Sequence, residues 1–406
     1  MSEKIKLLFL GITMNCAGTE KAFLSLARHL DYDRFDVTLL LAKAGGPLFE
    51  QIPKEIKVIE MPVYGEMFTL SGGTAMRAIW DCYVKKNPFV LFEIFPYAVR
   101  YLFGKKKRSQ TAMRLWVRLM KKMPEVPGEY DVAAAFWGDK TMFYMVDKVK
   151  AKKKIAWLHF DYSNPPREDK LYLPYFLSCD KIINVSKAVD DELKARLPQI
   201  ADRCEVIENI IDPGLIWDLA LQGESFPDPW FTGKRILTIA RICEQKGVDF
   251  IPPVLRKLTA DGLPLRWYIV GGGDEDDVNR LKVQAVTEEV ADKLFLLGPK
   301  TNPYGFLRDC DIFVLPSRYE GKPITVEEAK IMYKPILVSR YLSAEEQLDG
   351  GRLGYITDIG EEGLLRGLKK LLGDPELCDM YTERLSKLPR SVNLEPVLRF
   401  EEICAE

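Results

Sequence analysis

The chain has 406 residues, of which 47% are apolar and 29% charged, and its formal net charge is -1. One hydrophobic core rarely extends over so long a chain, so we expect two domains. The ordinary composition excludes wholesale disorder, and the balanced charge gives no sign of nucleic-acid binding.

Cysteine and histidine usage excludes two further classes. The eight cysteines form no CxxC pair, and the only histidines are His29 and His159. A zinc cluster therefore lacks ligands, and a disulfide framework is not expected in so long a chain. The apolar run at 7–10 is too short for a transmembrane helix, and no signal-peptide cleavage pattern follows it. We expect a cytoplasmic protein with reduced thiols.

In the first half of the chain, short apolar runs alternate with amphipathic stretches. Helical periodicity is clear at 20–30 and 187–197. Buried strands joined by crossover helices predict a parallel sheet covered on both faces. The predicted strands are 5–12, 35–42, 57–61, 132–137, 154–159 and 181–185.

The alternation breaks at 209–233, where clustered proline and glycine indicate a linker. It then resumes, which predicts a second sheet of the same kind. Open sheets of this type bind ligands at the carboxyl ends of their strands, so two of them would face a central cleft. The predicted strands of the second half are 235–239, 265–270, 293–297, 311–316 and 335–339, and the helices are 247–260, 275–286, 323–333 and 361–372.

Residues 85–122 are basic and aromatic together, with Glu93 as the lone acid. Basic amphipathic helices with bulky apolar faces lie on anionic membrane surfaces, and we favour that interpretation. The alternative is a helical insertion whose basic face is merely solvated. No nucleic-acid module accompanies these charges. The basic residues are Lys85, Lys86, Arg100, Lys105, Lys106, Lys107, Arg108, Arg114, Arg118, Lys121 and Lys122.

Two glutamates, Glu320 and Glu328, stand eight positions apart across the start of a predicted helix. Pro323 suits its first turn, where a missing N–H costs nothing. The first-turn amides and the helix dipole would favour an anion such as a diphosphate. Glu320 could accept hydrogen bonds from sugar hydroxyls, and Glu328 from a ribose diol.

A second motif, Arg241 with Lys246, follows the first strand of the second half. A guanidinium and an ammonium at a strand-to-helix junction would bracket an anion. Together they could stabilise the negative charge that develops on a departing diphosphate. Taken alone, the residues of either motif could be surface charges. Because the two motifs and the order of the predicted strands agree with one another, we favour a functional role.

These motifs resemble the donor domain of family 4 retaining glycosyltransferases, the glycosyl transferases group 1 type of the GT-B fold. The resemblance spans about 182–372 and includes the glycine turn Gly271–Gly273 and the strand and loop ending at Gly298. It implies an α/β protein of two doubly wound Rossmann-like domains. An acceptor domain of 1–209, with an insertion at about 64–127 and a helix at 387–406 packing back, would precede a donor domain of 210–386.

The resemblance also implies site residues. Arg241 and Lys246 would bind the donor diphosphate and Glu328 the ribose, while the loop at Gly298 would hold the base. In the first domain, Gly18 looks like the family's phosphate-approaching glycine, and His159 occupies the place of a histidine that faces the sugar. A strand-end histidine is also often a structural partner of a carbonyl. The sugar and phosphates would contact Glu320, Gly321, Lys322, Pro323, Ile324 and Thr325.

Some positions depart from the family pattern. Ala17 stands where a second glycine is common, and Lys322 replaces an apolar residue beside Glu320. These differences bear on the donor rather than on the fold. The acids at 274–277 suggest a helix N-terminus more than a metal site, and the GxGxxG dinucleotide fingerprint is not matched.

The implied reaction moves a sugar from a nucleoside diphosphate, UDP or GDP, to an acceptor hydroxyl with retention of configuration. The acceptor would be a bacterial cell-surface polysaccharide or a glycolipid. We expect no cofactor and no essential metal, since Arg241 and Lys246 would neutralise the diphosphate. A phosphorylase-like or nucleotide-sugar-modifying enzyme on the same fold is one alternative, and a catalytically silent scaffold at the inner membrane face is another. An oxidoreductase lacks its fingerprint.

Overall fold

The computed structural model describes residues 3–61, 64–69, 74–104, 108–260 and 262–406. The chain forms two compact units. The first comprises 1–185, 189–208 and 395–406, and the second comprises 186–188 and 209–394. Lys105, Lys106 and Lys107, which belong to the basic segment, lie outside the described residues.

The first unit is built on a parallel sheet of seven strands in the order β3-β2-β1-β4-β5-β6-β7. Its strands are β1 (Ile5–Gly11), β2 (Phe35–Leu41), β3 (Lys57–Glu60), β4 (Tyr130–Ala135), β5 (Ala151–Leu158), β6 (Lys181–Asn184) and β7 (Cys204–Val206). Its helices are α1 (Gly18–Ala27), α2 (Thr74–Ile79), α3 (Val90–Phe103), α4 (Arg108–Met120), α5 (Asp139–Lys148), α6 (Asp169–Leu177), α7 (Lys187–Arg196) and α16 (Glu395–Ala405).

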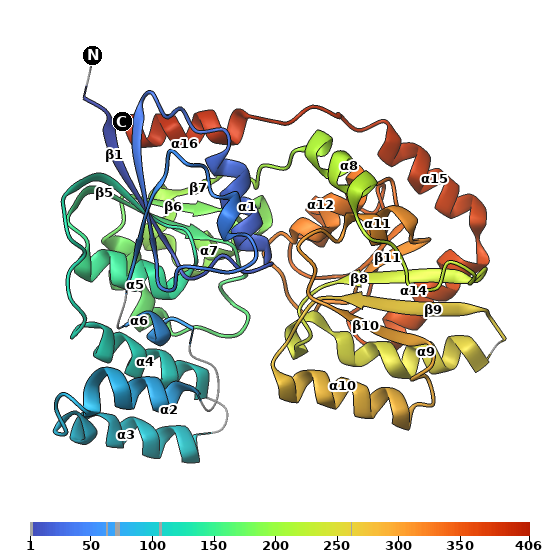
Figure 1. Cartoon of the computed structure of the whole chain (residues 1–406), viewed down its shortest axis with the longest axis horizontal. Coiled ribbons are helices and arrows are strands. Elements are labelled where there is room, and N and C mark those ends of the chain that lie inside the picture. Colours follow the sequence, from blue (N-terminus) through green and yellow to red (C-terminus); the bar gives the residue numbers. More distant parts are fainter. Residues whose placement is uncertain (1–2, 62–63, 70–73, 105–107, 261) are drawn as a thin grey trace. The chain divides into compact units, whose positions relative to one another are not determined.

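Helix α16 comes from the end of the chain but packs on the first sheet (Figure 1). The ring of Phe400 lies 5.7 Å from that of Phe9 in β1 and 5.3 Å from that of Trp157 in β5. Glu401, which is buried, accepts a hydrogen bond from the backbone N–H of Asp31 at 2.8 Å. Burial of these aromatic rings stabilises the return of the chain to the first unit.

The second unit has a parallel sheet of six strands in the order β10-β9-β8-β11-β12-β13. The strands are β8 (Lys234–Ile239), β9 (Leu265–Val270), β10 (Leu294–Gly298), β11 (Ile312–Leu315), β12 (Ile336–Ser339) and β13 (Tyr355–Thr357). The helices are α8 (Pro213–Gln222), α9 (Ile251–Ala260), α10 (Glu275–Thr287), α11 (Tyr304–Asp309), α12 (Ile324–Ile331), α13 (Ala344–Gln347), α14 (Glu361–Gly373) and α15 (Pro375–Ser386).

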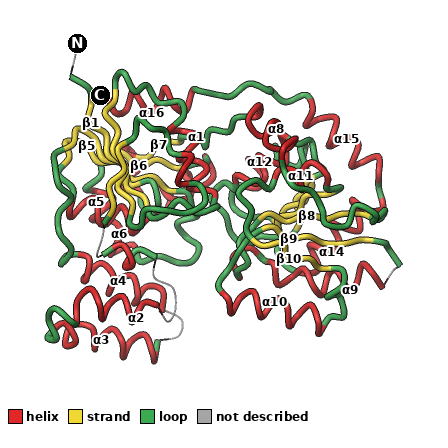
Figure 2. The backbone as a smooth tube through the Cα atoms, viewed as in Figure 1, coloured by secondary structure: helices red, strands yellow, loops and turns green. Residues whose placement is uncertain are grey.

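Alternate side chains of this second sheet enter two separate cores, because successive residues of a strand point to opposite faces. Leu237 and Tyr268 pack with α8, α11 and α12. Ile236 and Trp267 pack with α9, α10 and α14. Figure 2 shows the strands of each unit in yellow with helices in red around them. The doubly wound α/β architecture expected from the alternating sequence is confirmed.

The linker predicted at 209–233 is wrong over 213–222, because helix α8 occupies those residues. Asp212 caps this helix by accepting a hydrogen bond from the Leu215 N–H at 3.1 Å, and Pro213 fills the first helical position. Ile216 and Ala220 are buried in the second unit's core. Pro213 and Gly223, two of the residues that suggested a linker, therefore begin and end a packed helix.

None of the helices in the described part of the chain is both long enough and apolar enough to span a bilayer. All eight cysteines are free.

Candidate functional site

The candidate donor residues gather at the carboxyl edge of the second sheet. Strand β8 leads into Arg241, β10 ends at Gly298, and β11 leads into Glu320. The chain runs from β8 through β9 to β10 on one side and returns with β11 on the other side of β8. The sheet order therefore reverses between β8 and β11, which is where open α/β sheets form a ligand-binding crevice.

Lys246 and Glu320 meet at this reversal point. The Lys246 Nζ atom lies 2.6 Å from Glu320 Oε1, and the two side chains are 16% and 7% exposed. The Ser317 hydroxyl donates to the same oxygen at 2.6 Å. Two donors on one carboxylate oxygen fix the orientation of the Glu320 side chain.

Gly247 explains why Lys246 can reach Glu320. The glycine adopts the left-handed conformation, with a φ of 66°, and ends the short 3-10 turn Glu244–Lys246. A Cβ atom at this position would lie 2.0 Å from the carbonyl oxygen of Pro316, the residue that follows β11. Only glycine permits this approach of the two loops.

Arg241 is exposed, and Gln245 links it to the loop that carries Glu320. Its guanidinium donates to Gln245 Oε1 at 3.2 Å, and the Gln245 side-chain amide donates to the Tyr319 carbonyl at 3.1 Å. The loop after β9 closes against the same segment, since Ile242 N–H donates to the Gly272 carbonyl at 2.7 Å. Arg241, Lys246 and Glu320 thus belong to one set of linked loops.

Helix α12 begins one residue later than predicted. Pro323 is the N-cap residue, with an extended ψ of 121°, and the helix starts at Ile324. Gly321, Pro323 and Ile324 are buried, while Thr325 is half-buried. The Lys322 side chain is 10% exposed, and its Nζ lies 3.4 Å from Glu346 Oε1. The amides of this turn carry the positive end of the helix dipole.

Glu328 lies deeper than Glu320. It is 1% exposed, and its Oε1 accepts a hydrogen bond from the Tyr304 hydroxyl at 2.7 Å. Beneath the same helix, burial together with the negative charges of Glu320 and Glu327 raises the pKa of Tyr341 well above its usual range. Tyr341 therefore stays neutral and donates to Gln347 Oε1 at 2.7 Å.

Gly18 and His159 lie in the first unit, at the carboxyl edge of its sheet. Gly18 is the first, exposed residue of α1, and His159 directly follows β5. The His159 ring stacks on Trp157 at 6.0 Å and contacts Phe136 at 4.6 Å. Burial lowers the pKa of His159 to about 3, so the imidazole is neutral. Its Nε2 atom has no hydrogen-bond partner among the described residues.

Sequence reasoning missed several residues of the site. Gln245 stands between Arg241 and Lys246, and Ser317 stands three residues before Glu320; in each case a polar side chain next to a charged one was the available signal. Tyr304 and Glu346 carried no signal, because their contacts with Glu328 and Lys322 depend on the tertiary fold.

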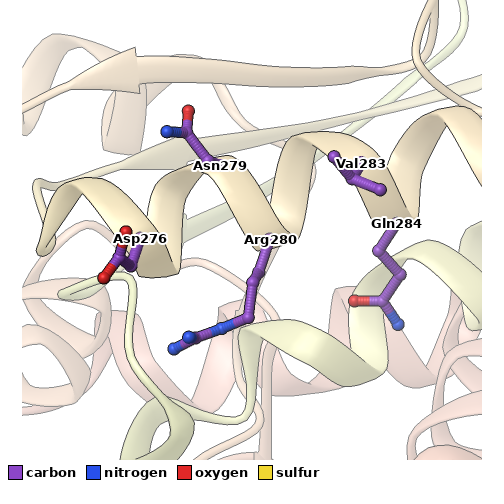
Figure 3. Close-up of a pocket in the computed structure, with 5 residues that line it drawn as sticks. All are labelled: Asp276, Asn279, Arg280, Val283 and Gln284. Carbon is purple, nitrogen blue, oxygen red and sulfur yellow. The ribbon is translucent and has the colours of Figure 1, made fainter.

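A shallow pocket on the second unit is separate from these residues. Figure 3 shows its lining along one side of α10, formed by Asp276, Asn279, Arg280, Val283 and Gln284. Arg280 pairs with Asp277 within the helix, and Gln284 donates to the Asp249 carbonyl at 2.8 Å. The described residues contain no group of three or more His, Cys, Asp or Glu that could hold a metal ion. Asp274 is the N-cap of α10 and the acids at 275–277 lie in its first turn, where the helix dipole favours negative charge.

Comparisons with known proteins bear on the family and on the fold. Residues 229–387 match the family model of glycosyl transferases group 1. An uncharacterized glycosyltransferase of Haemophilus influenzae is 24% identical over 252 residues, which cover 61% of this chain and 67% of the relative. A Campylobacter jejuni relative is 26% identical over 208 residues, which cover 50% of this chain and 54% of its own. It is named N-acetylgalactosamine-N,N'-diacetylbacillosaminyl-diphospho-undecaprenol 4-alpha-N-acetylgalactosaminyltransferase.

Solved structures are similar over the whole chain. Anabaena HepE in complex with UDP and glucose has a TM-score of 0.67 at 16% identity, with 99% of each chain covered. A glycosyltransferase from Rickettsia africae has a TM-score of 0.65 at 17% identity, with 99% of this chain and 98% of that chain covered. At such low identity the likeness establishes the shared fold.

Proposed function

We propose that the protein is a retaining glycosyltransferase. The premise is that the chain has the GT-B fold and that its residues 229–387 match the glycosyl transferases group 1 family. It would move a sugar from a nucleoside diphosphate to an acceptor hydroxyl. The observation that carries the proposal is the Lys246–Glu320 pair at the reversal point of the second sheet, with Arg241 beside it. Cations, a fixed carboxylate and a helix N-terminus there suit a diphosphate with a sugar attached.

Each group has a role in this proposal. Arg241 and Lys246 bind the diphosphate, and backbone N–H groups within 321–325, where Pro323 has none, add hydrogen bonds to it. Glu320 accepts from sugar hydroxyls, and Lys322 contacts sugar or phosphate. The loop at Gly298 holds the base. Because Glu328 is 1% exposed, its contact with a ribose diol requires a small shift of the neighbouring chain when the donor binds.

The proposed reaction proceeds on one face of the sugar. The acceptor oxygen forms a bond to the anomeric carbon while the bond from that carbon to the phosphate oxygen breaks. The departing phosphate oxygen takes the acceptor proton, so no covalent intermediate with the enzyme forms. Arg241 and Lys246 stabilise the charge on the diphosphate, which removes the need for a metal ion. Neutral His159, with its buried Nε2 lacking a partner among the described residues, suits a hydrogen bond to the sugar.

The relatives guide the choice of substrates. The name of the Campylobacter relative includes a diphospho-undecaprenol acceptor, and the HepE structure holds UDP and glucose. We therefore propose a UDP- or GDP-sugar donor, and a lipid-linked or polysaccharide acceptor in bacterial cell-surface glycan synthesis.

A screen of nucleotides by thermal shift and calorimetry tests the donor site. A ligand at 100 times its Kd stabilises the native state by about 2.7 kcal/mol, which a melting curve detects. We expect UDP or GDP to stabilise the wild type, and Arg241→Ala to weaken that nucleotide about 10- to 100-fold through loss of one charge-assisted contact. Because Arg241 is exposed, its replacement should change stability by less than about 0.5 kcal/mol.

Arg280→Ala is the matched control, since Arg280 is an exposed arginine of the same unit that lines the pocket on α10. A loss of binding in Arg280→Ala but not in Arg241→Ala would reject the donor site at the β8–β11 reversal. If no nucleoside diphosphate or nucleotide sugar binds the wild type, the transferase proposal fails and a silent scaffold takes its place. The anomeric configuration of the product, read by NMR, tests retention, and turnover in EDTA tests metal independence.

A further inference from the structure

Helix α3 of the first unit has an apolar face that no described residue covers. Val90 and Ile94 point inward and are buried, whereas the opposite side of the same helix is exposed to solvent. We define the α3 outer face by its exposed apolar residues. They are Leu91 (45% exposed), Phe92 (78%), Phe95 (68%), Val99 (38%), Leu102 (65%) and Phe103 (85%).

These residues form one continuous stripe, because positions three, four and seven apart lie on the same side of a helix. Large aromatic side chains are rarely left so exposed, and a contiguous apolar patch usually marks an interaction site. Figure 1 shows α3 at the outer edge of the first unit, and its contacts with α4 account for its inner side. The stripe is therefore not needed to hold α3 in place.

The segment of sequence that contains α3 is strongly basic. Residues 85–122 contain eleven lysines and arginines and the single acid Glu93. Glu93 faces inward, where it pairs with Arg118 and Lys122 of the α4 region at 2.9 Å each. The α3 outer face thus carries no acid, and Arg100 and Arg108, both exposed, flank it. Such a surface complements negative charge.

We propose that the α3 outer face binds the surface of an anionic lipid bilayer, with α3 lying in the plane of the interface. A helix of 14 residues is about 21 Å long, shorter than the ~30 Å hydrocarbon core, so it lies on the membrane rather than spanning it. Its apolar stripe enters the boundary between headgroups and acyl chains, and the flanking cations contact lipid phosphates. A second copy of the chain is a poorer partner, since two equally basic faces repel each other.

This inference does not depend on the transferase reaction, so vesicle binding and turnover can fail separately. The probe is flotation of the full chain with vesicles of equimolar phosphatidylcholine and phosphatidylglycerol, compared with vesicles of phosphatidylcholine alone. We expect binding to the anionic vesicles that weakens as salt increases. Hydrogen exchange on the bound protein should slow at α3 and leave the exposed helix α10 unchanged.

The variant Phe92→Gln/Phe95→Gln/Leu102→Gln removes the centre of the stripe. Glutamine is a good helix former and these side chains are exposed, so the fold should persist. In the proposed complex these three side chains enter the bilayer, so their loss should weaken vesicle binding at least about 100-fold. The matched control is Val283→Gln/Val286→Gln, which removes two apolar residues, each 66% exposed, from α10 of the other unit. It should bind like the wild type.

Three results would overturn the proposal. One is a wild type that ignores anionic vesicles at low salt, and another is a triple variant that binds them equally well. The third is a concentration-dependent dimer in sedimentation that the triple variant abolishes, because the stripe would then serve a second copy of the chain.

Discussion

The ammonium of Lys246 lies 2.6 Å from the carboxylate of Glu320, although 74 positions of sequence separate the two residues. Both side chains are largely buried, and Ser317 adds a second hydrogen bond to the same carboxylate oxygen. The two residues that we propose to bind donor phosphate and sugar therefore pair with each other. Donor binding must exchange this contact for contacts with the ligand.

Removal of either Lys246 or Glu320 alone should destabilise the protein. Lys246→Met leaves a buried carboxylate without its cation, which should lower the free energy of unfolding by about 3 kcal/mol. The double variant Lys246→Met/Glu320→Gln removes both charges and should recover most of that loss, because an apolar or neutral replacement of a buried pair is often nearly neutral. Urea denaturation of the single and double variants measures the coupling. Simple additivity of the two single changes would show that the pair is not formed in solution.

Sequence patterns were enough to predict the fold. Strand β9 was predicted at its observed bounds, 265–270, and the other long strands within a few residues, because buried parallel strands are continuous apolar runs. The edge strands β7 and β13 were missed, since each has three residues and leaves no periodic signal. Helix α8 was missed because its proline and glycine suggested a linker, although Ile216 and Ala220 have helical spacing.

The site was only partly predictable. Arg241, Lys246 and Glu320 stand out because strand ends followed by charged residues indicate a ligand edge. That Lys246 pairs with Glu320 depends on β8 and β11 being neighbours, which the sequence does not specify. The Tyr304–Glu328 contact likewise joins two helices through the core. Long-range pairing of this kind follows from packing rather than from local pattern.

Gly247 should tolerate no side chain. In Gly247→Ala the new methyl group would meet the Pro316 carbonyl oxygen, and the residue would also be held in the left-handed conformation. We expect a loss of more than about 3 kcal/mol, measured by urea denaturation, together with weaker nucleotide binding as Lys246 is displaced. Gly262→Ala is the control, because Gly262 also has a positive φ but has open space around it. It should lose only about 1 kcal/mol. Equal losses would rule out a steric role for Gly247.

The hydroxyl of Tyr304, which donates to a carboxylate, should contribute more to stability than the hydroxyl of Tyr341, which donates to a neutral amide. Tyr304→Phe removes a hydrogen bond to a buried carboxylate, for an expected loss of about 1.5–3 kcal/mol. Tyr341→Phe removes a neutral hydrogen bond to Gln347, also buried, for about 1 kcal/mol. Chemical denaturation of both variants compares them directly. If Tyr304→Phe were the milder change, Glu328 would have found another donor, and its proposed ribose contact would not rely on Tyr304.

His159 should make the first unit sensitive to acid. Its pKa falls from 6.5 in the unfolded chain to about 3 in the folded one, because burial disfavours the imidazolium. Between these values the unfolded state binds the proton and the folded state does not, so stability is lost as the pH falls from 6.5 to 3 at up to about 1.4 kcal/mol per pH unit. His159→Phe keeps an aromatic ring against Trp157 and Phe136 but cannot take a proton. Carboxylates are common to both proteins, so their contribution cancels in the difference between the two urea-denaturation profiles. We expect that difference to shift in favour of the variant as the pH falls, and parallel profiles would mean that His159 is solvated rather than held neutral at the sheet edge.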